Sequence, residues 1–331
     1  MFGFLRLSGV SRVLVAQSSL VLSSRGSRGL TGGCQSELTV SVGEMVAQLE
    51  REFQAREVGE PDLSALYLVG QAMGCANPDG LRQRHWNQTL NETQLACVQR
   101  FRQCRLAHMP IQYILGEWDF RGLTLTVRPP VFIPRPETEQ LIDLVTPLVL
   151  SAGESDRVLE IGCGSGAISL SLLHEIQGLS LTAVDQSRAA CALTMENALN
   201  LGMDSRLSVR RGQIRPDGSL EHWAENQTYH VIVSNPPYVL RKDLLGLQRE
   251  ITLYEDLRAL DGGRHGLDVI LPILKFASNH LVQGGHICME VDPCHPLILP
   301  EEMDKCPDIN LRIKSVHPDL YGKERFIIFQ K

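Results

Sequence analysis

The sequence lacks a run of apolar residues as long as the roughly eighteen that a membrane-spanning helix needs. Its nine cysteines include no C-x-x-C pair, and Cys294-His295 has no second pair at ligand spacing. A zinc site and a disulfide framework are therefore disfavoured. No segment is dense in arginine and lysine, as nucleic-acid recognition requires. We expect no membrane span, no metal site, no direct nucleic-acid binding, and free thiols in a reducing compartment.

Acidic residues are absent from the first 36 positions, where four arginines and many serines occur. This composition is typical of a mitochondrial transit peptide. A secretory signal is the alternative, because residues 13–22 are moderately apolar, but Arg12 and the arginines beyond it break the expected order of charged and apolar regions. We predict a transit peptide over residues 1–36 and a location in the mitochondrial matrix.

The rest of the chain is acidic. The formal net charge of the whole sequence is −6, and removal of four arginines takes it to about −10. An acidic body disfavours broad, nonspecific binding to nucleic acid. The chain has 331 residues and is 43% apolar, which suits a soluble enzyme with one large α/β domain and a smaller companion.

The motif Asn235-Pro236-Pro237-Tyr238 follows the apolar run 231–234. The lone pair of a planar amide or ring-bound nitrogen is delocalised, so an enzyme that alkylates this nitrogen has to hold its two hydrogens. The Asn235 side-chain oxygen and a proline carbonyl can accept them, and the prolines add no N–H donor. Tyr238 offers a flat face for the substrate. We interpret the motif as the catalytic site of an amino-methyltransferase; a plain turn that closes a strand is the alternative.

A glycine-rich turn supplies the second half of the expected site. Residues 156–161 are typical of a buried strand and run into Gly162-Cys163-Gly164-Ser165-Gly166, before an apolar helix over 167–176. Glycine permits positive φ and a close approach of the backbone to a ligand at a helix N-terminus. A second strand ends in Asp185, where a carboxylate can accept the hydroxyls of a ribose.

The cofactor is not decided by these residues alone, because nicotinamide dehydrogenases use a similar turn and a similarly placed acid. An ordinary tight turn is a further alternative. The spacing G-x-G-x-G after Glu160 favours S-adenosyl-L-methionine. The Asn-Pro-Pro-Tyr motif at the end of the fourth expected strand decides for this cofactor.

Strands and helices alternate from residue 156 onward, which predicts an α/β fold with a mostly parallel sheet and helices on both faces. The last two strands are joined by a short connection and predict an antiparallel edge. Seven strands are expected, near residues 157–161, 180–185, 206–210, 229–234, 286–291, 309–316 and 325–330.

Three helical patterns precede this sheet, over residues 41–56, 62–74 and 89–108. The last opens with Thr89-Leu90-Asn91-Glu92, which has the spacing of a capping box. Residues 111–131 alternate around two glycines and predict a β-hairpin, and Pro136 suits the first turn of a following helix. We expect a helical domain over 37–109, a β-hairpin linker over 110–135 and a methyltransferase domain over 136–331.

Four segments of the chain, taken together, are more specific than any one motif. They are Pro110 to Phe120, Phe132 to Glu139, Glu160 to Gly166 and Ser234 to Tyr238. In this order they resemble the HemK/PrmC family, and the resemblance covers about residue 40 to the C-terminus. That family methylates the N5 of the glutamine in the Gly-Gly-Gln loop of class I peptide chain release factors.

The resemblance implies a Rossmann-like class I methyltransferase sheet that acts on mitochondrial class I release factors with S-adenosyl-L-methionine. We expect the helical domain to dock the release factor, which is too large to be held by the catalytic pocket alone. We expect a cofactor site at Gly162, Cys163, Gly164, Ser165, Gly166, Asp185 and Asn235. The substrate glutamine would lie against Asn235, Pro236, Pro237, Tyr238, Phe132, Arg135 and Glu137.

The chain departs from the family pattern in two places. Asp256 stands where the family usually has a proline before an Ala-Leu and a glycine pair. Gln213 and Ile214 stand where the family tends to have an acidic residue and an aromatic near the adenine.

A nucleic-acid adenine-N6 methyltransferase is the main alternative, because the exocyclic amine of adenine presents the same –NH2 geometry and such enzymes carry the same tetrapeptide. The acidic body and the sparse basic residues count against it. A hydride-transferring oxidoreductase and a non-enzymatic interaction scaffold are further alternatives.

Overall fold

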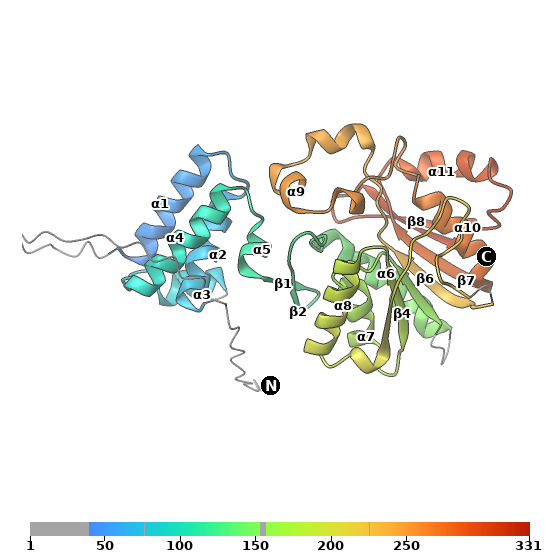
Figure 1. Ribbon diagram of the computed structural model, residues 1–331, viewed down its shortest axis with the longest axis horizontal. Coiled ribbons are helices and arrows are strands. Elements are labelled where there is room, and N and C mark those ends of the chain that lie inside the picture. Colours follow the sequence, from blue (N-terminus) through green and yellow to red (C-terminus); the bar gives the residue numbers. More distant parts are fainter. Residues whose placement is uncertain (1–39, 76, 153–156, 225) are drawn as a thin grey trace, which may run out of the picture. The chain divides into compact units, whose positions relative to one another are not determined.

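The computed structural model describes residues 40–331 apart from 76, 153–156 and 225 (Figure 1). The predicted transit peptide over residues 1–36 therefore lies outside the described residues. In the part of the chain that is described, no helix combines the length and the apolar character that a bilayer crossing requires.

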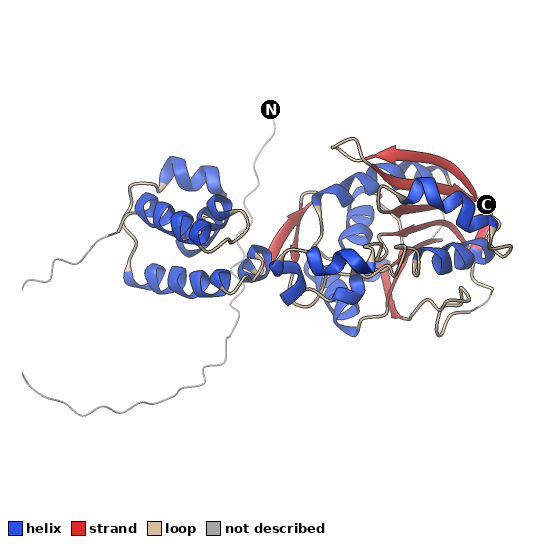
Figure 2. Cartoon of the chain, turned by 90° about the horizontal axis from the view of Figure 1, so that it is seen from above, coloured by secondary structure: helices blue, strands red, loops and turns tan. Residues whose placement is uncertain are grey.

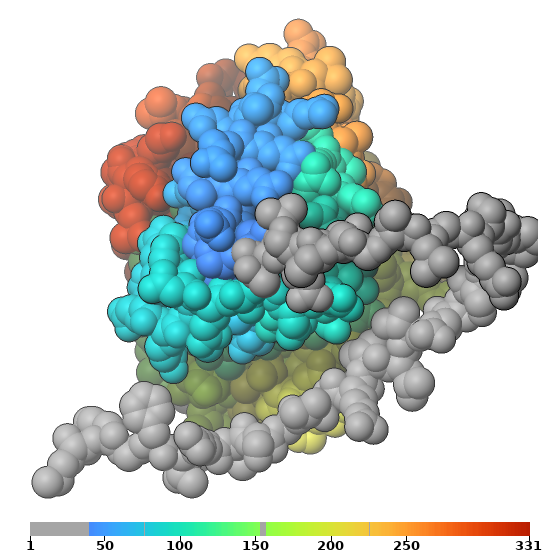
Figure 3. Space-filling model, turned by 90° about the vertical axis from the view of Figure 1, so that its left-hand side faces the viewer, coloured from blue at the N-terminus to red at the C-terminus, as the bar shows by residue number. Residues whose placement is uncertain are grey.

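The first described elements are helices that share one apolar core. Ser41 begins the first of them with a capping box, in which its side chain and that of Glu44 each accept a hydrogen bond from the other residue's backbone N–H. Leu49, Phe53 and Leu66 are among the side chains buried between these helices. The helices are α1 (Val42–Ala55), α2 (Pro61–Met73), α3 (Pro78–Arg84), α4 (Glu92–Leu106) and α5 (Ile111–Leu115). We call residues 40–116 the helical region, and Figure 3 shows its surface in blue and cyan.

Two details of this region differ from the sequence prediction. The capping box of α4 is formed by Asn91 and Gln94, and Thr89 instead forms an isolated antiparallel bridge with Ser41. The prediction was wrong because Asn91 is also a strong N-cap residue and has Gln94 at the required spacing. The short helix α3 was not predicted; Asn77 caps it through hydrogen bonds from the backbone N–H groups of Asp79 and Gly80.

The predicted hairpin is present but shorter than residues 111–131. Its first five residues form α5, which ends at Gly116 with a φ of 80°. The strands β1 (Glu117–Phe120) and β2 (Leu123–Thr126) pair antiparallel, with Arg121 and Gly122 between them. Both turn residues have positive φ, of 49° and 74°, as a tight two-residue hairpin turn demands.

The chain from residue 158 onward is built around a seven-stranded sheet, as predicted. The strand order is β5-β4-β3-β6-β7-β9-β8; the first five strands are parallel, and β9 runs antiparallel to both of its neighbours. The antiparallel edge is thereby confirmed. The strands are β3 (Val158–Ile161), β4 (Leu181–Asp185), β5 (Leu207–Arg211), β6 (Tyr229–Ser234), β7 (Leu281–Glu290), β8 (Arg312–Pro318) and β9 (Glu324–Gln330).

Apolar side chains on both faces of the strands explain why the sheet is covered on both sides. In β6, Val231 and Val233 belong to one buried cluster, whereas Ile232 between them belongs to another. Successive side chains of a strand point to opposite faces, so a continuous apolar run needs two protecting layers.

Helices supply these two layers, as the blue helices around the red strands of Figure 2 show. Side chains of α6 (Glu139–Ser151) and α7 (Ala167–Glu175) pack in the cluster of Val231. Side chains of α10 (Ile270–His280) and α11 (His295–Asp304) pack in the cluster of Ile232. The remaining elements are η1 (Pro136–Thr138), α8 (Arg188–Asn200), η2 (Asp204–Arg206), η3 (Arg241–Gly246), α9 (Arg249–Tyr254) and η4 (Leu257–Ala259).

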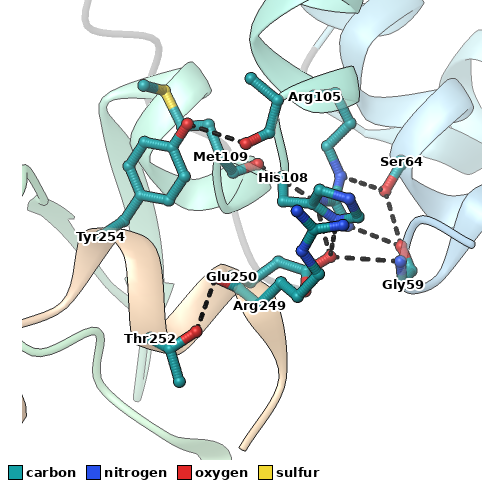
Figure 4. Close-up of polar contacts among 10 residues, drawn as sticks. Gly59, Ser64, Arg105, His108, Met109, Arg249, Glu250, Thr252 and Tyr254 are labelled. Atoms are coloured by element: carbon teal, nitrogen blue, oxygen red, sulfur yellow. Dashed lines mark hydrogen bonds and ion pairs between the residues drawn. The ribbon is translucent and has the colours of Figure 1, made fainter.

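A buried arginine joins the helical region to α9 (Figure 4). The Arg105 side chain lies 3.1 Å from the Glu250 carboxylate, and it also donates to the Ser64 hydroxyl at 3.0 Å and to the Gly59 carbonyl at 2.6 Å. The Gly59 N–H donates to the same carboxylate at 3.2 Å. Only 4% of Arg105 is exposed, so these partners, and not water, stabilise its positive charge.

We expect Arg105→Ala to destabilise the protein by about 3–5 kcal/mol, because it leaves the Glu250 carboxylate partly buried and without its cation. The matched control is Arg102→Ala in the same helix, whose ion pair with Glu52 is more exposed and should contribute about 1 kcal/mol or less. Urea unfolding of both variants measures the difference. Equal losses in the two variants would contradict the special role of Arg105.

Candidate active site

A pocket lies at the carboxyl ends of β3, β4 and β6, the edge at which parallel sheets bind ligands. About 1060 Å³ of this pocket, including its open mouth, is free of protein atoms. Eight of the predicted site residues line it: Phe132, Gly162, Gly164, Asp185, Asn235, Pro236, Pro237 and Tyr238. The structure thus brings together the Asn-Pro-Pro-Tyr motif, the glycine turn and the acid after β4, which lie far apart in the sequence.

Only part of the glycine turn faces the pocket. Gly162 and Gly164 line it, with φ values of 85° and 55°. Cys163, Ser165 and Gly166 are buried and do not line it. A Cβ on Gly166 would come within 3.0 Å of the Thr194 side chain, so this glycine permits close packing of helix α8. A Cβ on Gly164 would meet no atom within 4 Å, which leaves open space beside the turn for a ligand.

Asp185 is held at the pocket by two backbone donors. Its Oδ2 accepts the Gly164 N–H at 3.0 Å, and its Oδ1 accepts the Ser187 N–H at 2.8 Å. Burial raises the pKa of Asp185 above its usual range, although these two hydrogen bonds oppose the shift. Each carboxylate oxygen can accept a second hydrogen bond, so Asp185 is still able to receive the hydroxyls of a bound nucleoside.

The side chains of Asn235 and Tyr238 are fixed by partners outside the motif. Asn235 donates from Nδ2 to Thr138 Oγ1 at 3.1 Å, and Tyr238 donates its hydroxyl to Glu290 Oε1 at 2.8 Å. In the described part of the chain, Oδ1 of Asn235 accepts no hydrogen bond. Burial, followed by the negative charge of Glu290, raises the pKa of Tyr238, so this hydroxyl stays protonated at neutral pH. The motif therefore offers a free acceptor to the pocket.

The main chain of Tyr238 is closely packed against two glycines. A Cβ on Gly262 would lie 2.8 Å from the Tyr238 Cα, and one on Gly266 would lie 2.5 Å from the Tyr238 carbonyl oxygen. Val239 continues the contact by exchanging backbone hydrogen bonds of 2.9 Å with Leu260 and Gly262. These glycines hold the loop that presents the motif.

The predicted residues Phe132, Arg135 and Glu137 do not all lie at the pocket. Phe132 lines the pocket, but Arg135 and Glu137 do not. The guanidinium of Arg135 stacks 4.6 Å from the centre of the Phe132 ring and lies 2.6 Å from the Glu255 carboxylate. Arg135 therefore supports the pocket wall by holding Phe132 in place.

Both departures from the family pattern lie at the pocket. Gln213 and Ile214 line it beside Asp185. The backbone N–H of Asp256 donates to the Pro130 carbonyl at 2.8 Å, a bond that a proline at this position is unable to make. The Asp256 carboxylate pairs with Arg258 at 2.7 Å, and this hydrogen-bonded pairing lowers the pKa of Asp256.

Sequence reasoning missed Thr138 and Glu290 as functional candidates. Glu290 ends β7 at the edge of the sheet where Asp185 ends β4, and the same rule for strand ends applies to both. Thr138 ends η1 and carries no signal of its own, because its role follows from packing against Asn235 and Glu290.

Comparison with known proteins identifies the family. Residues 44–116 match the PrmC N-terminal domain, and residues 138–251 match the methyltransferase small domain. A human relative named MTRF1L release factor glutamine methyltransferase is 41% identical over 86% of this chain and 86% of its own length. The chain belongs to the release factor glutamine methyltransferase family. The resemblance to HemK/PrmC predicted from the motifs is confirmed.

Two bacterial members of the release factor glutamine methyltransferase family match shorter stretches. The protein of that name from Gloeobacter violaceus is 37% identical and covers 55% of this chain and 62% of its own length. The one from Geobacter sulfurreducens is 36% identical and covers 62% of this chain and 69% of its own length. The predicted domain boundaries at residues 109 and 135 stay a prediction, because one domain match ends at residue 116 and the other begins at residue 138, and neither position defines a boundary.

Glu160, which precedes the glycine turn, is a buried acid. Burial raises its pKa to about 8, although the backbone and hydroxyl of Ser169 donate hydrogen bonds that oppose the shift. Below the unfolded-state pKa, near 4.3, both the folded and the unfolded protein hold this proton. Between that value and about 8 the unfolded chain ionises while the folded protein stays protonated, so stability falls as the pH rises.

We therefore expect Glu160→Gln to remove a downward slope in unfolding free energy of up to about 1.4 kcal/mol per pH unit between pH 5 and pH 8. Denaturant unfolding at several pH values measures this slope. Glu117→Gln, at an exposed position of β1, serves as the control and should keep the wild-type slope. An unchanged slope in Glu160→Gln would show that Glu160 is not the titrating group.

Proposed function

We propose that the protein transfers a methyl group from S-adenosyl-L-methionine to the N5 of the glutamine in the Gly-Gly-Gln motif of class I peptide chain release factors. The observation that carries this proposal is the free Oδ1 of Asn235 at the edge of a pocket that also contains Asp185 and the glycine turn. Membership of the release factor glutamine methyltransferase family supports it.

The substrate side of the proposed site binds a primary amide through acceptors. Asn235 Oδ1 and the Pro236 carbonyl receive the two amide hydrogens, which directs the nitrogen lone pair toward the methyl donor. Pro236 and Pro237 have no N–H group to compete for these acceptors. The ring of Tyr238 lies against the amide plane, while its hydroxyl stays bound to Glu290. Holding both reactants in line in this way is worth up to roughly 7–11 kcal/mol of the barrier.

The cofactor side of the pocket is suited to a nucleoside that carries a sulfonium group. That group supplies an electrophilic methyl with a neutral thioether as leaving group. In our proposal Asp185 accepts the ribose hydroxyls, and the open space beside Gly164 receives the methionine part. Ile214, Leu260 and Val269 provide an apolar wall for the adenine.

The alternatives considered for the sequence gain no support. Adenine-N6 methylation, hydride transfer and a purely structural role all differ from the activity after which the relatives are named. The acidic composition of the chain also disfavours a nucleic-acid substrate.

We expect Asn235→Ala still to bind S-adenosyl-L-methionine but to lower kcat by about 100-fold or more, because the principal acceptor for the amide is lost. Mass spectrometry of the Gly-Gly-Gln peptide of a purified release factor measures methylation, and calorimetry measures cofactor binding. Asn200→Ala, on the exposed side of α8, is the control. Near-wild-type methylation by Asn235→Ala would refute the assigned role.

We propose mitochondrial release factors as the substrates and the mitochondrial matrix as the location, on the basis of the composition of residues 1–36. Mass spectrometry of Gly-Gly-Gln peptides from mitochondria with and without the protein tests both points. Unchanged glutamine methylation in mitochondria that lack the protein would refute them.

We also propose that the helical region docks the release factor, because a pocket that holds one side chain contacts little of a whole protein. Arg105 holds this region to α9 through Glu250. Arg105→Ala should therefore raise the KM for the release factor more than the KM for S-adenosyl-L-methionine. An equal rise in both constants would count against docking.

A further inference from the structure

Glu290 is a buried acid that does not line the pocket, but it is hydrogen-bonded to Tyr238, which does, and to Thr138, which in turn bonds to Asn235 in the pocket wall. It is 1% exposed, at the carboxyl end of β7. Its Oε1 accepts the Tyr238 hydroxyl at 2.8 Å, and its Oε2 accepts the Thr138 hydroxyl at 2.7 Å. A carboxyl group in this position has lost its contact with water, so it depends on these two hydrogen bonds.

The Thr138 hydroxyl connects Glu290 to Asn235. A hydroxyl has one hydrogen, and here that hydrogen is given to Glu290. Thr138 Oγ1 is then only an acceptor toward Asn235, whose Nδ2 lies 3.1 Å away. The amide group of Asn235 must therefore turn its NH2 toward Thr138 and its Oδ1 away from it.

The two hydroxyl donors set the direction of this chain of hydrogen bonds, because Thr138 and Tyr238 both donate to the Glu290 carboxyl group. Burial raises the pKa of Glu290, while the two donated O–H bonds and the nearby cation of Arg325 oppose this shift. Arg325 is itself held by Asp319 at 2.9 Å.

The orientation of Asn235 decides whether the site suits an amide nitrogen. With Oδ1 toward the pocket, Asn235 accepts a hydrogen of the substrate –NH2. In the flipped orientation it would present its own –NH2 to that group, and two donors would face each other. We propose that Glu290 and Thr138 are positioning residues that select the accepting orientation of the Asn235 amide and fix the Tyr238 ring. This inference rests on the proposed function, since it concerns the same amide site.

The test compares Thr138→Val with Thr138→Ser. Valine has the shape of threonine without the hydroxyl, so the Asn235 amide loses its fixed orientation, and we expect kcat to fall about 10- to 100-fold. The dissociation constant for S-adenosyl-L-methionine should change less than about threefold. Serine keeps the hydroxyl and should retain at least about a third of the wild-type kcat. Wild-type kcat in Thr138→Val, or an equal loss in both variants, would overturn the proposal.

A second variant tests the part played by Glu290. Glu290→Met replaces the carboxylate by an apolar side chain of similar size, which a buried site can tolerate. We expect a loss of kcat comparable to that of Thr138→Val. Because both substitutions break one chain of hydrogen bonds, the double variant should lose no more than about threefold beyond the worse single variant. Losses that multiply would show that the two residues act independently and would contradict the proposal.

A measurement without turnover separates this inference from the proposed function. In protein labelled with ¹⁵N-asparagine, the Asn235 side-chain NH2 signal is assigned by its absence in Asn235→Ala. One of its hydrogens should exchange slowly in the wild type and in Thr138→Ser, and rapidly in Thr138→Val. This pattern would support the positioning role even if the wild type failed to methylate a release factor, a failure that would refute the proposed function alone. Exchange that is equally fast in all three proteins would overturn the positioning role.

Discussion

The site depends on one geometric constraint, which is that neighbouring parallel strands end at the same edge of the sheet. β3, β4 and β6 run parallel and side by side, so the residues that follow them meet at their carboxyl ends. Gly162, Asp185 and Asn235 come together for this reason. β7 is parallel to β6 and adds Glu290 beside them. A shift of one strand by a single residue would turn its side chains to the opposite face and dismantle the site.

Sequence reasoning could predict what this constraint determines. The apolar runs that become β3, β4 and β6 are strongly patterned, and the polar or glycine residue that ends each run marks a position at the ligand edge. The parallel sheet, its antiparallel edge and the pocket residues that follow these strands were accordingly predictable, whereas Phe132 was expected from the family resemblance alone. The Asn-Pro-Pro-Tyr motif added the chemistry.

The missed features are those that no local pattern encodes. Helix α3 has seven residues and α5 has five, which is too short for an apolar period to be recognised. Thr138 acquires its role only because η1 is packed against Asn235 and Glu290. Arg105 looks like an ordinary charge on a helix in the sequence, and its burial becomes evident only when α9 is in place.

The crowding of Gly262 and Gly266 against Tyr238 has a consequence for how a protein can enter the site. The tyrosine backbone has no room to withdraw, because even a methyl group on either glycine would overlap it. We therefore expect this loop to move little when a substrate binds, so that the incoming polypeptide has to bend to fit it. A glutamine preceded by two glycines is well suited to this demand, since glycine reaches backbone angles that other residues avoid. In our proposal, selectivity for such a segment therefore depends on its backbone flexibility as well as on its amide group.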